Sequence, residues 1–320
     1  MTRLAIVCPC YNEHEVLLQS AKRLEDLLDK LIRAGKISVG SFVLLVNDGS
    51  KDNTWQLISQ LHAENPMFKG VNLARNVGVQ CATLAGLMTA KDHCDAMITI
   101  DIDLQDDLKA LEEMIDRFHD GYDIVYGVKV SREADPFLKK AMAITFYRLQ
   151  RAMGIEIIYN HSEFRLLSKR TVEQLSHYSE RNLYLRGLIP MIGYPATTVD
   201  DVISQRTAGK SKFTFKKLLM LAIDGITSFS TKPISLIVGA GLFCLLISIG
   251  IFIYVICSYV EHLSVPGWPS IMLSLWFIGG LLLVSIGIIG EYIGKIYIEV
   301  KHRPLYNIEK VLWEGNNEPK

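Results

Sequence analysis

Short apolar runs alternate with amphipathic segments through the first part of the chain. Five runs have the length of buried strands, at 4–8, 42–46, 71–73, 96–100 and 124–126. Between them, apolar residues at helical spacing predict helices near 14–34, 52–64, 77–91 and 108–120. Strands that alternate with helices predict an α/β domain with a mostly parallel sheet. Ligand crevices in such sheets form at the carboxyl ends of the strands.

A second pattern follows, in which charged residues are missing from 234–260 and from 270–290. Each stretch is longer than the roughly 18 apolar residues that indicate a membrane-spanning helix, so we expect a two-helix hairpin. The intervening residues 261–269 contain no Lys or Arg, whereas the flanks carry Lys232, Lys295, Lys301 and Arg303. By the positive-inside rule, this asymmetry predicts that both termini are cytoplasmic. A buried pair of helices in a large soluble protein would show the same apolar pattern.

These patterns predict four parts: a cytoplasmic domain at 1–212, a juxtamembrane amphipathic helix at 213–230, the membrane hairpin at 231–294 and a cytoplasmic tail at 295–320. We expect no secretory signal, because the apolar run at 4–10 is too short for one. Segments 137–153 and 213–229 mix apolar residues with Lys and Arg. Such helices rest in a membrane interface or, alternatively, pack against the sheet.

Charge and cysteine usage narrow the class of protein. The 320 residues carry 34 basic and 34 acidic side chains, so the formal net charge is zero and we expect no nucleic-acid partner. The six cysteines are scattered and do not form a secreted disulfide framework, which favours a reducing compartment. Cys8 and Cys10 lack the further Cys or His residues that would complete a metal site. We therefore expect them to be buried thiols.

Candidate chemistry lies where the 96–100 strand ends, in the sequence Asp101-Ile102-Asp103-Leu104-Gln105. The carboxylates of Asp101 and Asp103 are hard oxygen ligands of the kind that suits Mg²⁺ or Mn²⁺ bound together with substrate phosphates. Acidic pairs also occur at strand ends simply as turn and helix-cap residues. The chain has neither a P-loop nor a three-glycine dinucleotide fingerprint after its first strand, so a bound nucleotide would be held in another way.

Four motifs in order resemble the signature of family 2 glycosyltransferases with the GT-A fold: Pro9-Cys10-Tyr11-Asn12-Glu13, Val46-Asn47-Asp48-Gly49-Ser50, Arg75-Asn76-Val77-Gly78 and the acidic sequence from Asp101 to Asp106. Later sequences are similar to those of polyprenyl-phosphate glycosyltransferases, such as bactoprenol glucosyltransferases and, more distantly, dolichol-phosphate mannose synthase. These are Glu163-Phe164-Arg165-Leu166, Glu180-Arg181-Asn182-Leu183, Arg206 with Gly209-Lys210-Ser211-Lys212, Ser228-Phe229-Ser230, Gly290-Glu291-Tyr292-Ile293-Gly294 and Arg303-Pro304. The resemblance covers residues 4 to about 306.

The resemblance implies roles for these residues. A nucleotide-sugar would be held by Pro9, Tyr11, Asn12, Glu13, Asp48, Asp101, Arg206, Ser211 and Lys212. A divalent ion would be held by Asp101, Asp103 and Gln105, where it would offset the charge of the leaving diphosphate. Arg206, Ser211 and Lys212 match a loop that closes over the diphosphate, although they also fit a basic cluster facing the membrane. The catalytic group would comprise Asp103, Glu163 and Arg165.

The acceptor implied by the resemblance is a lipid phosphate, which is already a nucleophile near neutral pH. Such an anion needs cations more than a general base, and the candidates are Lys129, Arg132 and Arg165, with Arg132 favoured by its loop position. Each could instead be an ordinary solvated side chain. Glu163 departs from the family, which has Asp or a small hydroxyl residue there. It could orient a substrate, act as a base or pair with Arg165.

The sequence therefore predicts inverting transfer of one hexose, glucose or N-acetylglucosamine, from a UDP-sugar to undecaprenyl phosphate. We expect this at the cytoplasmic face of the bacterial inner membrane, for cell-envelope glycan modification by a multi-pass protein. Some relatives form oligomers, which leaves a homo-oligomer open. A processive polysaccharide synthase is an alternative, but it would carry a Gln-x-x-Arg-Trp motif and more membrane spans. The second alternative is a membrane-bound sugar-nucleotide sensor or scaffold that does not catalyse transfer.

Overall fold

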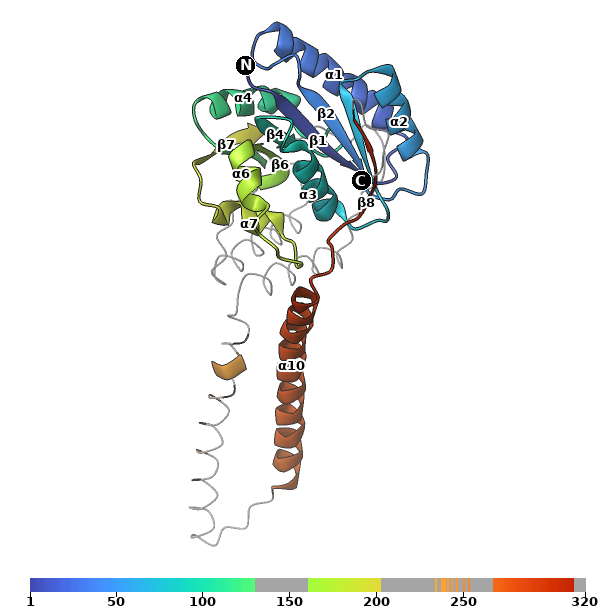
Figure 1. Ribbon diagram of the computed structural model, residues 1–320. Coiled ribbons are helices and arrows are strands. Elements are labelled where there is room, and N and C mark those ends of the chain that lie inside the picture. Colours follow the sequence, from blue (N-terminus) through green and yellow to red (C-terminus); the bar gives the residue numbers. More distant parts are fainter. Residues whose placement is uncertain are drawn as a thin grey trace. The chain divides into compact units, whose positions relative to one another are not determined.

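The computed structural model describes residues 1–129, 161–202 and 267–313, with a few positions between 234 and 253 (Figure 1). The chain forms two compact units. The first comprises Met1–Arg151, Glu156–Thr214 and Arg303–Lys320, and the second comprises Ala152–Ile155 and Phe215–His302. Arg132, Arg206, Ser211 and Lys212 lie outside the described residues, as do segments 137–153 and 213–229.

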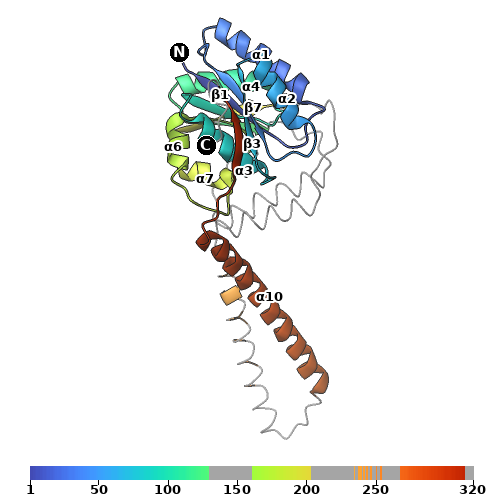
Figure 2. The same ribbon diagram turned by 45° about the vertical axis from the view of Figure 1, so that its right-hand side comes forward.

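A mixed eight-stranded sheet forms the centre of the first unit, in the order β7-β5-β6-β4-β1-β2-β3-β8 (Figures 1 and 2). Its strands are β1 (Leu4–Cys10), β2 (Phe42–Asn47), β3 (Phe68–Leu73), β4 (Ala96–Thr99), β5 (Ile124–Lys129), β6 (His161–Ser168), β7 (Ala196–Asp201) and β8 (Ile308–Leu312). The four strands β4, β1, β2 and β3 are parallel, as the alternating pattern predicted. β6 runs antiparallel to β4 and to β5, β7 is parallel to β5, and β8 is antiparallel to β3.

Helices cover both faces of this sheet. They are α1 (Leu17–Arg33), α2 (Thr54–Glu64), α3 (Val79–Ala90), α4 (Leu108–His119), α6 (Lys169–Leu175) and α7 (Leu185–Met191). Side chains of α1, α2 and α4 share a core with Leu4, Ile6 and Cys8, whereas α3 packs against the alternate residue Val7. A Cβ on Gly86 of α3 would lie only 2.4 Å from Val7 Cγ1, so this glycine permits the close approach of helix and sheet.

Cysteine placement agrees with the sequence prediction of buried thiols. Cys8 and Cys10 are buried in β1, and all the described cysteines are free. Burial, with a smaller contribution from Asp101, raises the pKa of the Cys8 thiol far above its ordinary value. These thiols therefore stay neutral and act as small apolar groups in the core.

The segment after the second unit returns to the first, which the sequence analysis did not anticipate. β8 forms the edge of the sheet beside β3, and Leu312 is buried in the core. Trp313 stacks edge-on against Phe42 at 5.1 Å between ring centroids and lies 4.3 Å from the His93 ring. Within the expected tail 295–320, residues 308–312 thus belong to the sheet, whereas 295–300 continue α10.

One long apolar helix is described in the second unit. α10 (Trp268–Val300) has 33 residues and begins after Gly267, with a proline in its first turn. Its Phe277–Val300 portion has a mean hydropathy of 1.8 with none of that stretch buried, so it is long and apolar enough to cross a membrane. Most of the other expected span, 234–260, lies outside the described residues, and the two-helix hairpin remains a prediction.

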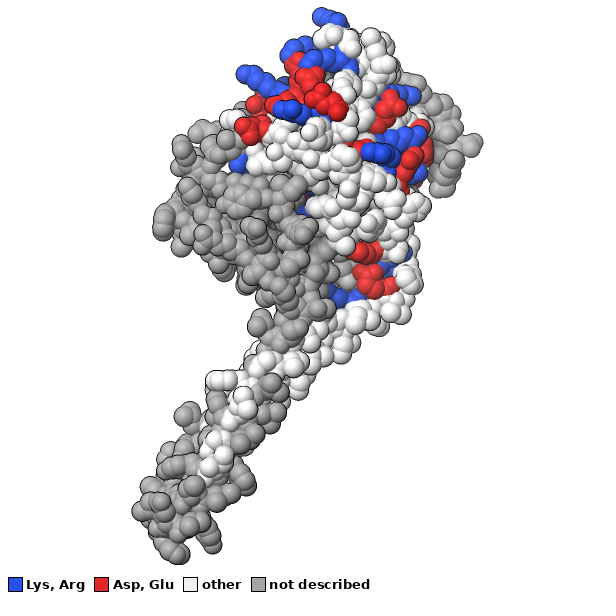
Figure 3. Space-filling view, turned by 90° about the vertical axis from the view of Figure 1, so that its left-hand side faces the viewer, with Lys and Arg blue, Asp and Glu red and all other residues white. Residues whose placement is uncertain are grey.

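Charges on the visible face of the first unit are mixed in sign (Figure 3). Lys30 of α1 reaches Glu112 of α4 at 2.9 Å, and Lys36 reaches Asp116 at 2.8 Å. Such exposed pairs contribute little stability individually, about 0–1 kcal/mol each. Their interspersed arrangement agrees with the absence of net charge in the sequence.

Candidate active site

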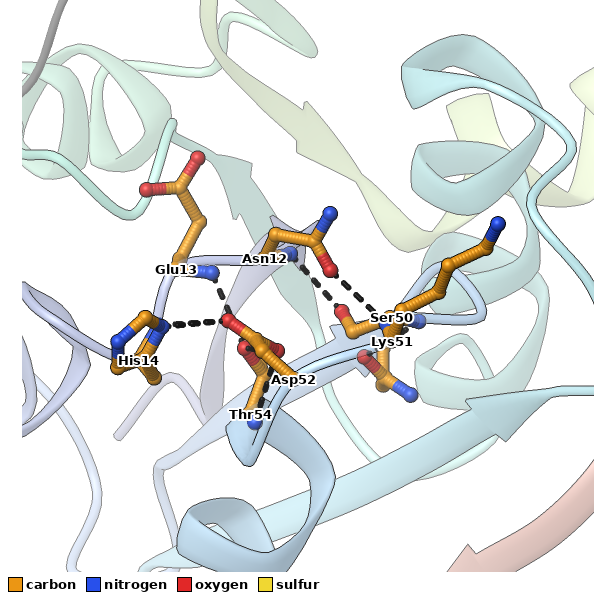
Figure 4. Close-up of polar contacts among 8 residues, drawn as sticks. Asn12, Glu13, His14, Ser50, Lys51, Asp52 and Thr54 are labelled. Carbon is orange, nitrogen blue, oxygen red and sulfur yellow. Dashed lines mark hydrogen bonds and ion pairs between the residues drawn. The ribbon is translucent and has the colours of Figure 1, made fainter.

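The segment that follows β1 is tied to the loop that follows β2 (Figure 4). Asn12 donates its backbone N–H to Ser50 Oγ at 3.0 Å and accepts from the backbone N–H of Lys51 at 2.9 Å. Glu13 donates its backbone N–H to Thr54 Oγ1 at 3.0 Å. Asn12 has a positive φ of 52°, which asparagine tolerates better than most residues. Two motifs far apart in sequence therefore form one surface at the carboxyl ends of neighbouring strands.

A histidine–aspartate pair that sequence reasoning did not single out completes this surface. His14 Nδ1 lies 2.6 Å from Asp52 Oδ2, and Asp52 also accepts from the hydroxyl and the backbone N–H of Thr54. Burial alone would raise the pKa of Asp52, but the hydrogen bonds from Thr54 and His14 outweigh it and lower the pKa. Asp52 thus accepts hydrogen bonds from Thr54, the first residue of α2, and fixes the loop geometry.

Asp48 organises the loop that follows β3. It is only 2% exposed and accepts from the backbone N–H of Val77 at 2.7 Å, from that of Gly78 at 3.0 Å and from Asn76 Nδ2 at 2.9 Å. Burial raises the pKa of its carboxyl, against the effect of the two backbone donors. The neighbouring Gly49 has a φ of 60°, and a Cβ there would lie 2.4 Å from the Arg75 carbonyl carbon. The second and third motifs therefore meet through Asp48.

The acidic motif forms a tight turn where β4 ends. Leu104 donates its backbone N–H to the Asp101 carbonyl at 3.0 Å and adopts a φ of 45°. A left-handed conformation costs a leucine about 1–2 kcal/mol, and here it is held by burial of Leu104 and Ile102. The turn leaves Asp101 exposed and Asp103 half-buried, and Gln105 Nε2 donates to Asp103 Oδ2 at 2.7 Å. Backbone strain of this kind is often concentrated at functional sites.

The turn has the donor chemistry of a divalent-ion site that is completed by substrate. Among the described residues, no three His, Cys, Asp or Glu side chains are grouped to hold a metal ion. The pKa of the Asp101 carboxyl is raised to about 6. The largest cause is desolvation by the surrounding protein, and the negative charges of Asp103 and Glu163 add to it. A hard cation would relieve this crowding of negative charge. Asp101 and Asp103 therefore fit Mg²⁺ or Mn²⁺ shared with a diphosphate, and Gln105 supports Asp103.

Glu163 lies beside the acidic turn because of the strand register. Thr99 of β4 is opposite Arg165 of β6, and continuing this antiparallel register brings Glu163 opposite Asp101. The Glu163 carboxylate pairs with the guanidinium of Arg165 and, at 2.6 Å, with Nε of Arg186 in α7. Burial alone would raise the pKa of Glu163, but the two arginines lower it to about 2. Arg165, only 1% exposed, lies behind Glu163.

Lys129 is the last residue of β5 and lies beside two buried aspartates, Asp106 and Asp201. The sequence analysis did not predict that these two residues form a pair. Lys129 is opposite Asp201 of β7, which is fully buried and accepts from the Asp107 backbone N–H at 2.9 Å. Burial and then the charge of Asp201 raise the pKa of Asp106, whereas Lys129 opposes the shift. Lys129 thus lies near three aspartates, since its charge also opposes the rise in the pKa of Asp101.

The structure brings together Asp101, Asp103, Gln105, Glu163 and Arg165 around the end of β4, with Lys129 near them. Pro9, Tyr11, Asn12, Glu13 and Asp48 belong to the neighbouring ends of β1 and β2, where Tyr11 is 36% exposed. Arg186 is a further residue that sequence reasoning missed. Its only sequence signal is its position shortly after Glu180-Arg181-Asn182-Leu183, and strand pairing decides its contact with Glu163.

The mixed sheet, with an acidic turn at the end of a central parallel strand, defines a GT-A-like glycosyltransferase. The family model described as Glycosyl transferase family 2 matches residues 5–176. YkoT, an uncharacterized glycosyltransferase of Bacillus subtilis, is 45% identical over 99% of this chain and 94% of that protein. The chain belongs to glycosyl transferase family 2.

Relatives with a more specific name also span the chain. The SfII prophage-derived bactoprenol glucosyl transferase of Shigella flexneri is 37% identical over 96% of this chain and 98% of that protein. Among solved structures, a Pyrobaculum calidifontis mannosyltransferase in complex with GDP-mannose and Mn²⁺ aligns with a TM-score of 0.44 at 16% identity, covering 93% of this chain and 85% of that one. The similarity to the mannosyltransferase structure is too low to support an argument about ligands.

Proposed function

We propose that this glycosyltransferase transfers one hexose from a UDP-sugar to undecaprenyl phosphate at the cytoplasmic face of the membrane. The observation that carries the proposal is the acidic turn beside the paired cations of β6 and α7, in a chain that also has an exposed apolar helix. The bactoprenol glucosyl transferase relatives support a prenyl-phosphate acceptor. Glucose and N-acetylglucosamine are the favoured sugars.

The reaction is a single displacement at the anomeric carbon. An oxygen of the lipid phosphate forms a bond to C1 of the sugar as the bond between C1 and the UDP oxygen breaks. The electron pair of that bond leaves with UDP, so no external proton or redox partner is needed. A divalent ion bound by Asp101 and Asp103 would neutralise the developing charge on the diphosphate. One such displacement inverts the configuration at C1.

The chain's own residues would divide the work along the sheet. The surface formed by 9–14 and 48–54 would hold the nucleoside, with the 75–78 loop kept in place by Asp48. Gln105 would hold Asp103 in the orientation that the diphosphate site requires. Lys129, Arg132 and Arg165 are the cations expected from the sequence for the acceptor, and Arg206, Ser211 and Lys212 are those expected for the donor.

β8 supports a hairpin arrangement of the membrane segment. Residues on both sides of the segment Phe215–His302 contribute to the first unit, since β7 precedes this segment and β8 follows it in one sheet. This arrangement favours placing both ends of 215–302 on the same side of a bilayer, with an even number of crossings between them. If α10 crosses once, a second crossing is required, and the apolar stretch 234–260 is the candidate for it.

Transfer from a panel of radiolabelled nucleotide-sugars to undecaprenyl phosphate in detergent tests the proposal. We expect one monoglycosylated lipid from wild type, lost on addition of EDTA and lost in Asp103→Ala. Asp26→Ala changes an exposed aspartate of α1 and is the matched control. A long polymer would instead establish a processive synthase. Nucleotide binding without any lipid product would favour the sensor or scaffold.

A further inference from the structure

Arg186 lies at the start of α7 with a fixed orientation. Its backbone neighbour Leu185 donates its N–H to Gln80 Oε1 of α3 at 2.8 Å, which anchors the helix start. Its side chain is 27% exposed, and its Nε donates to Glu163 Oε1 at 2.6 Å. The guanidinium is thus held at one edge by a carboxylate and is partly open to solvent.

Glu163 is itself held at several points. Its backbone carbonyl accepts from Thr99 Oγ1 at 2.5 Å and from Arg165 Nε at 3.4 Å, and its carboxylate pairs with the buried Arg165 guanidinium. Its two arginine partners lower its pKa to about 2, so the carboxylate is ionised near neutral pH. A carboxylate of such low basicity and fixed position is suited to orienting Arg186 and unsuited to removing a proton.

Arg186 lies near the acidic turn, because its partner Glu163 accepts a hydrogen bond from Thr99, two residues before Asp101. Sheet order determines the side of the turn on which it lies. The loops expected to hold the nucleoside follow β1, β2 and β3, whereas Glu163 lies on β6, and β4 with its acidic turn separates the two groups. The other expected donor residues, Arg206, Ser211 and Lys212, lie outside the described residues. Arg186 is therefore on the side of the turn opposite the nucleotide loops.

In a single displacement the attacking group approaches C1 opposite the leaving group. If the diphosphate lies between the acidic turn and the nucleotide loops, the acceptor phosphate must arrive from the β6 side. We infer that Arg186 binds the phosphate of the lipid acceptor there, that Glu163 positions it, and that Arg165 holds Glu163 from behind. This inference rests on the proposed function and adds a phosphate contact that the sequence did not identify. A guanidinium suits the task because its planar N–H groups can contact a carboxylate and a phosphate together.

The test compares Arg186→Gln and Arg186→Lys with wild type, using undecaprenyl phosphate and whichever UDP-sugar gives product. Loss of a charge-assisted hydrogen bond predicts a rise in acceptor KM of about 10- to 100-fold for Arg186→Gln. We expect a smaller rise for Arg186→Lys, and donor KM and UDP affinity within about twofold of wild type in both. Arg23→Gln, which changes an exposed arginine of α1, is the matched control and should leave both KM values unchanged.

A short-chain prenyl phosphate separates a phosphate contact from a lipid-chain contact. The rise in KM caused by Arg186→Gln should be the same for short and long acceptors, because the shared phosphate is the group contacted. Equal loss of donor and acceptor affinity, or an unchanged acceptor KM, overturns the inference. Should Arg186→Gln not fold, Arg186→Lys decides alone, because it keeps a charge to pair with Glu163.

Glu163→Gln tests the positioning role. It should raise acceptor KM by itself but add little to the effect of Arg186→Gln, because both act on one contact. The acid limb of its pH–rate profile should match that of wild type. An acid limb that disappears in Glu163→Gln would identify Glu163 as a base and overturn the positioning role. If wild type forms no glycolipid from any donor, the proposed function fails; if wild type transfers and these variants behave as controls, only the inference fails.

Discussion

Asp48→Asn tests whether Asp48 organises the 75–78 loop. The replacement keeps the size of the side chain but turns one acceptor oxygen into an NH₂ group. In the least costly orientation, the remaining oxygen accepts from Gly78 N–H and Asn76 Nδ2, and the new NH₂ faces the backbone N–H of Val77. One buried backbone donor is then left without an acceptor.

The expected loss follows from that unpaired donor. A buried group that loses its partner costs about 1–3 kcal/mol, and the lost charge assistance adds to this. Removing the charge offsets part of this loss of stability, because burial disfavours the ionised Asp48 carboxylate. The raised pKa of Asp48 reflects this effect of burial. We expect a net loss of about 1–3 kcal/mol in the free energy of unfolding, or about 2–10 °C in Tm for a domain of this size.

Thermal unfolding in detergent without nucleotide is the assay, with the exposed Asp26→Asn as control. The Tm of Asp48→Asn should fall, and UDP should widen its difference from wild type if the displaced loop weakens UDP binding. An unchanged Tm together with weakened UDP binding would refute the reasoning. It would assign Asp48 to direct nucleotide contact.

Three further predictions concern the first unit. Trp313→Ala removes the partly buried indole ring that contacts Phe42 and His93. It should lower the free energy of unfolding by about 2–3 kcal/mol, compared with a variant at an exposed site. Gly49→Ala places a Cβ against the Arg75 backbone and should lower Tm and UDP affinity together, a result that a merely flexible loop would not produce. The hydrogen bond from Arg170 lowers the pKa of Asp123, so this pair stabilises the fold above about pH 4 and loses its effect as pH falls through the folded pKa. The stability difference between wild type and Asp123→Asn should therefore shrink from pH 6 to pH 3, and a difference independent of pH would contradict the assignment.

Local pattern was sufficient for much of the fold. The run from Leu4 to Cys8 predicted β1, and helical spacing predicted a helix near 14–34, where the structure has α1 at Leu17–Arg33. These features depend on residue order alone, because side chains alternate across a strand and recur along one face of a helix. The same holds for the acidic motif at the end of β4, since strand ends of a parallel sheet meet at one edge.

Several features of the candidate site depend on partners distant in sequence. Asp48 accepts hydrogen bonds from residues that follow β3, and its expected contact with a nucleotide stays a prediction. Glu163 had three open roles, and the pairing of β6 with β4 brings it between Arg165 and Arg186. No periodicity in the sequence contains the register of an antiparallel pair.

By itself, the sequence determined the strand–helix alternation, the acidic turn, the apolar helix and the family, because each is written in local side-chain order and chemistry. Only the tertiary structure decided that β6 enters between β4 and β5, that β8 returns after α10 to close the edge beside β3, and that Arg186 reaches Glu163. The physical reason is that these contacts join residues far apart in sequence. Their energy comes from burial and charge pairing, which exist only once the sheet order is set.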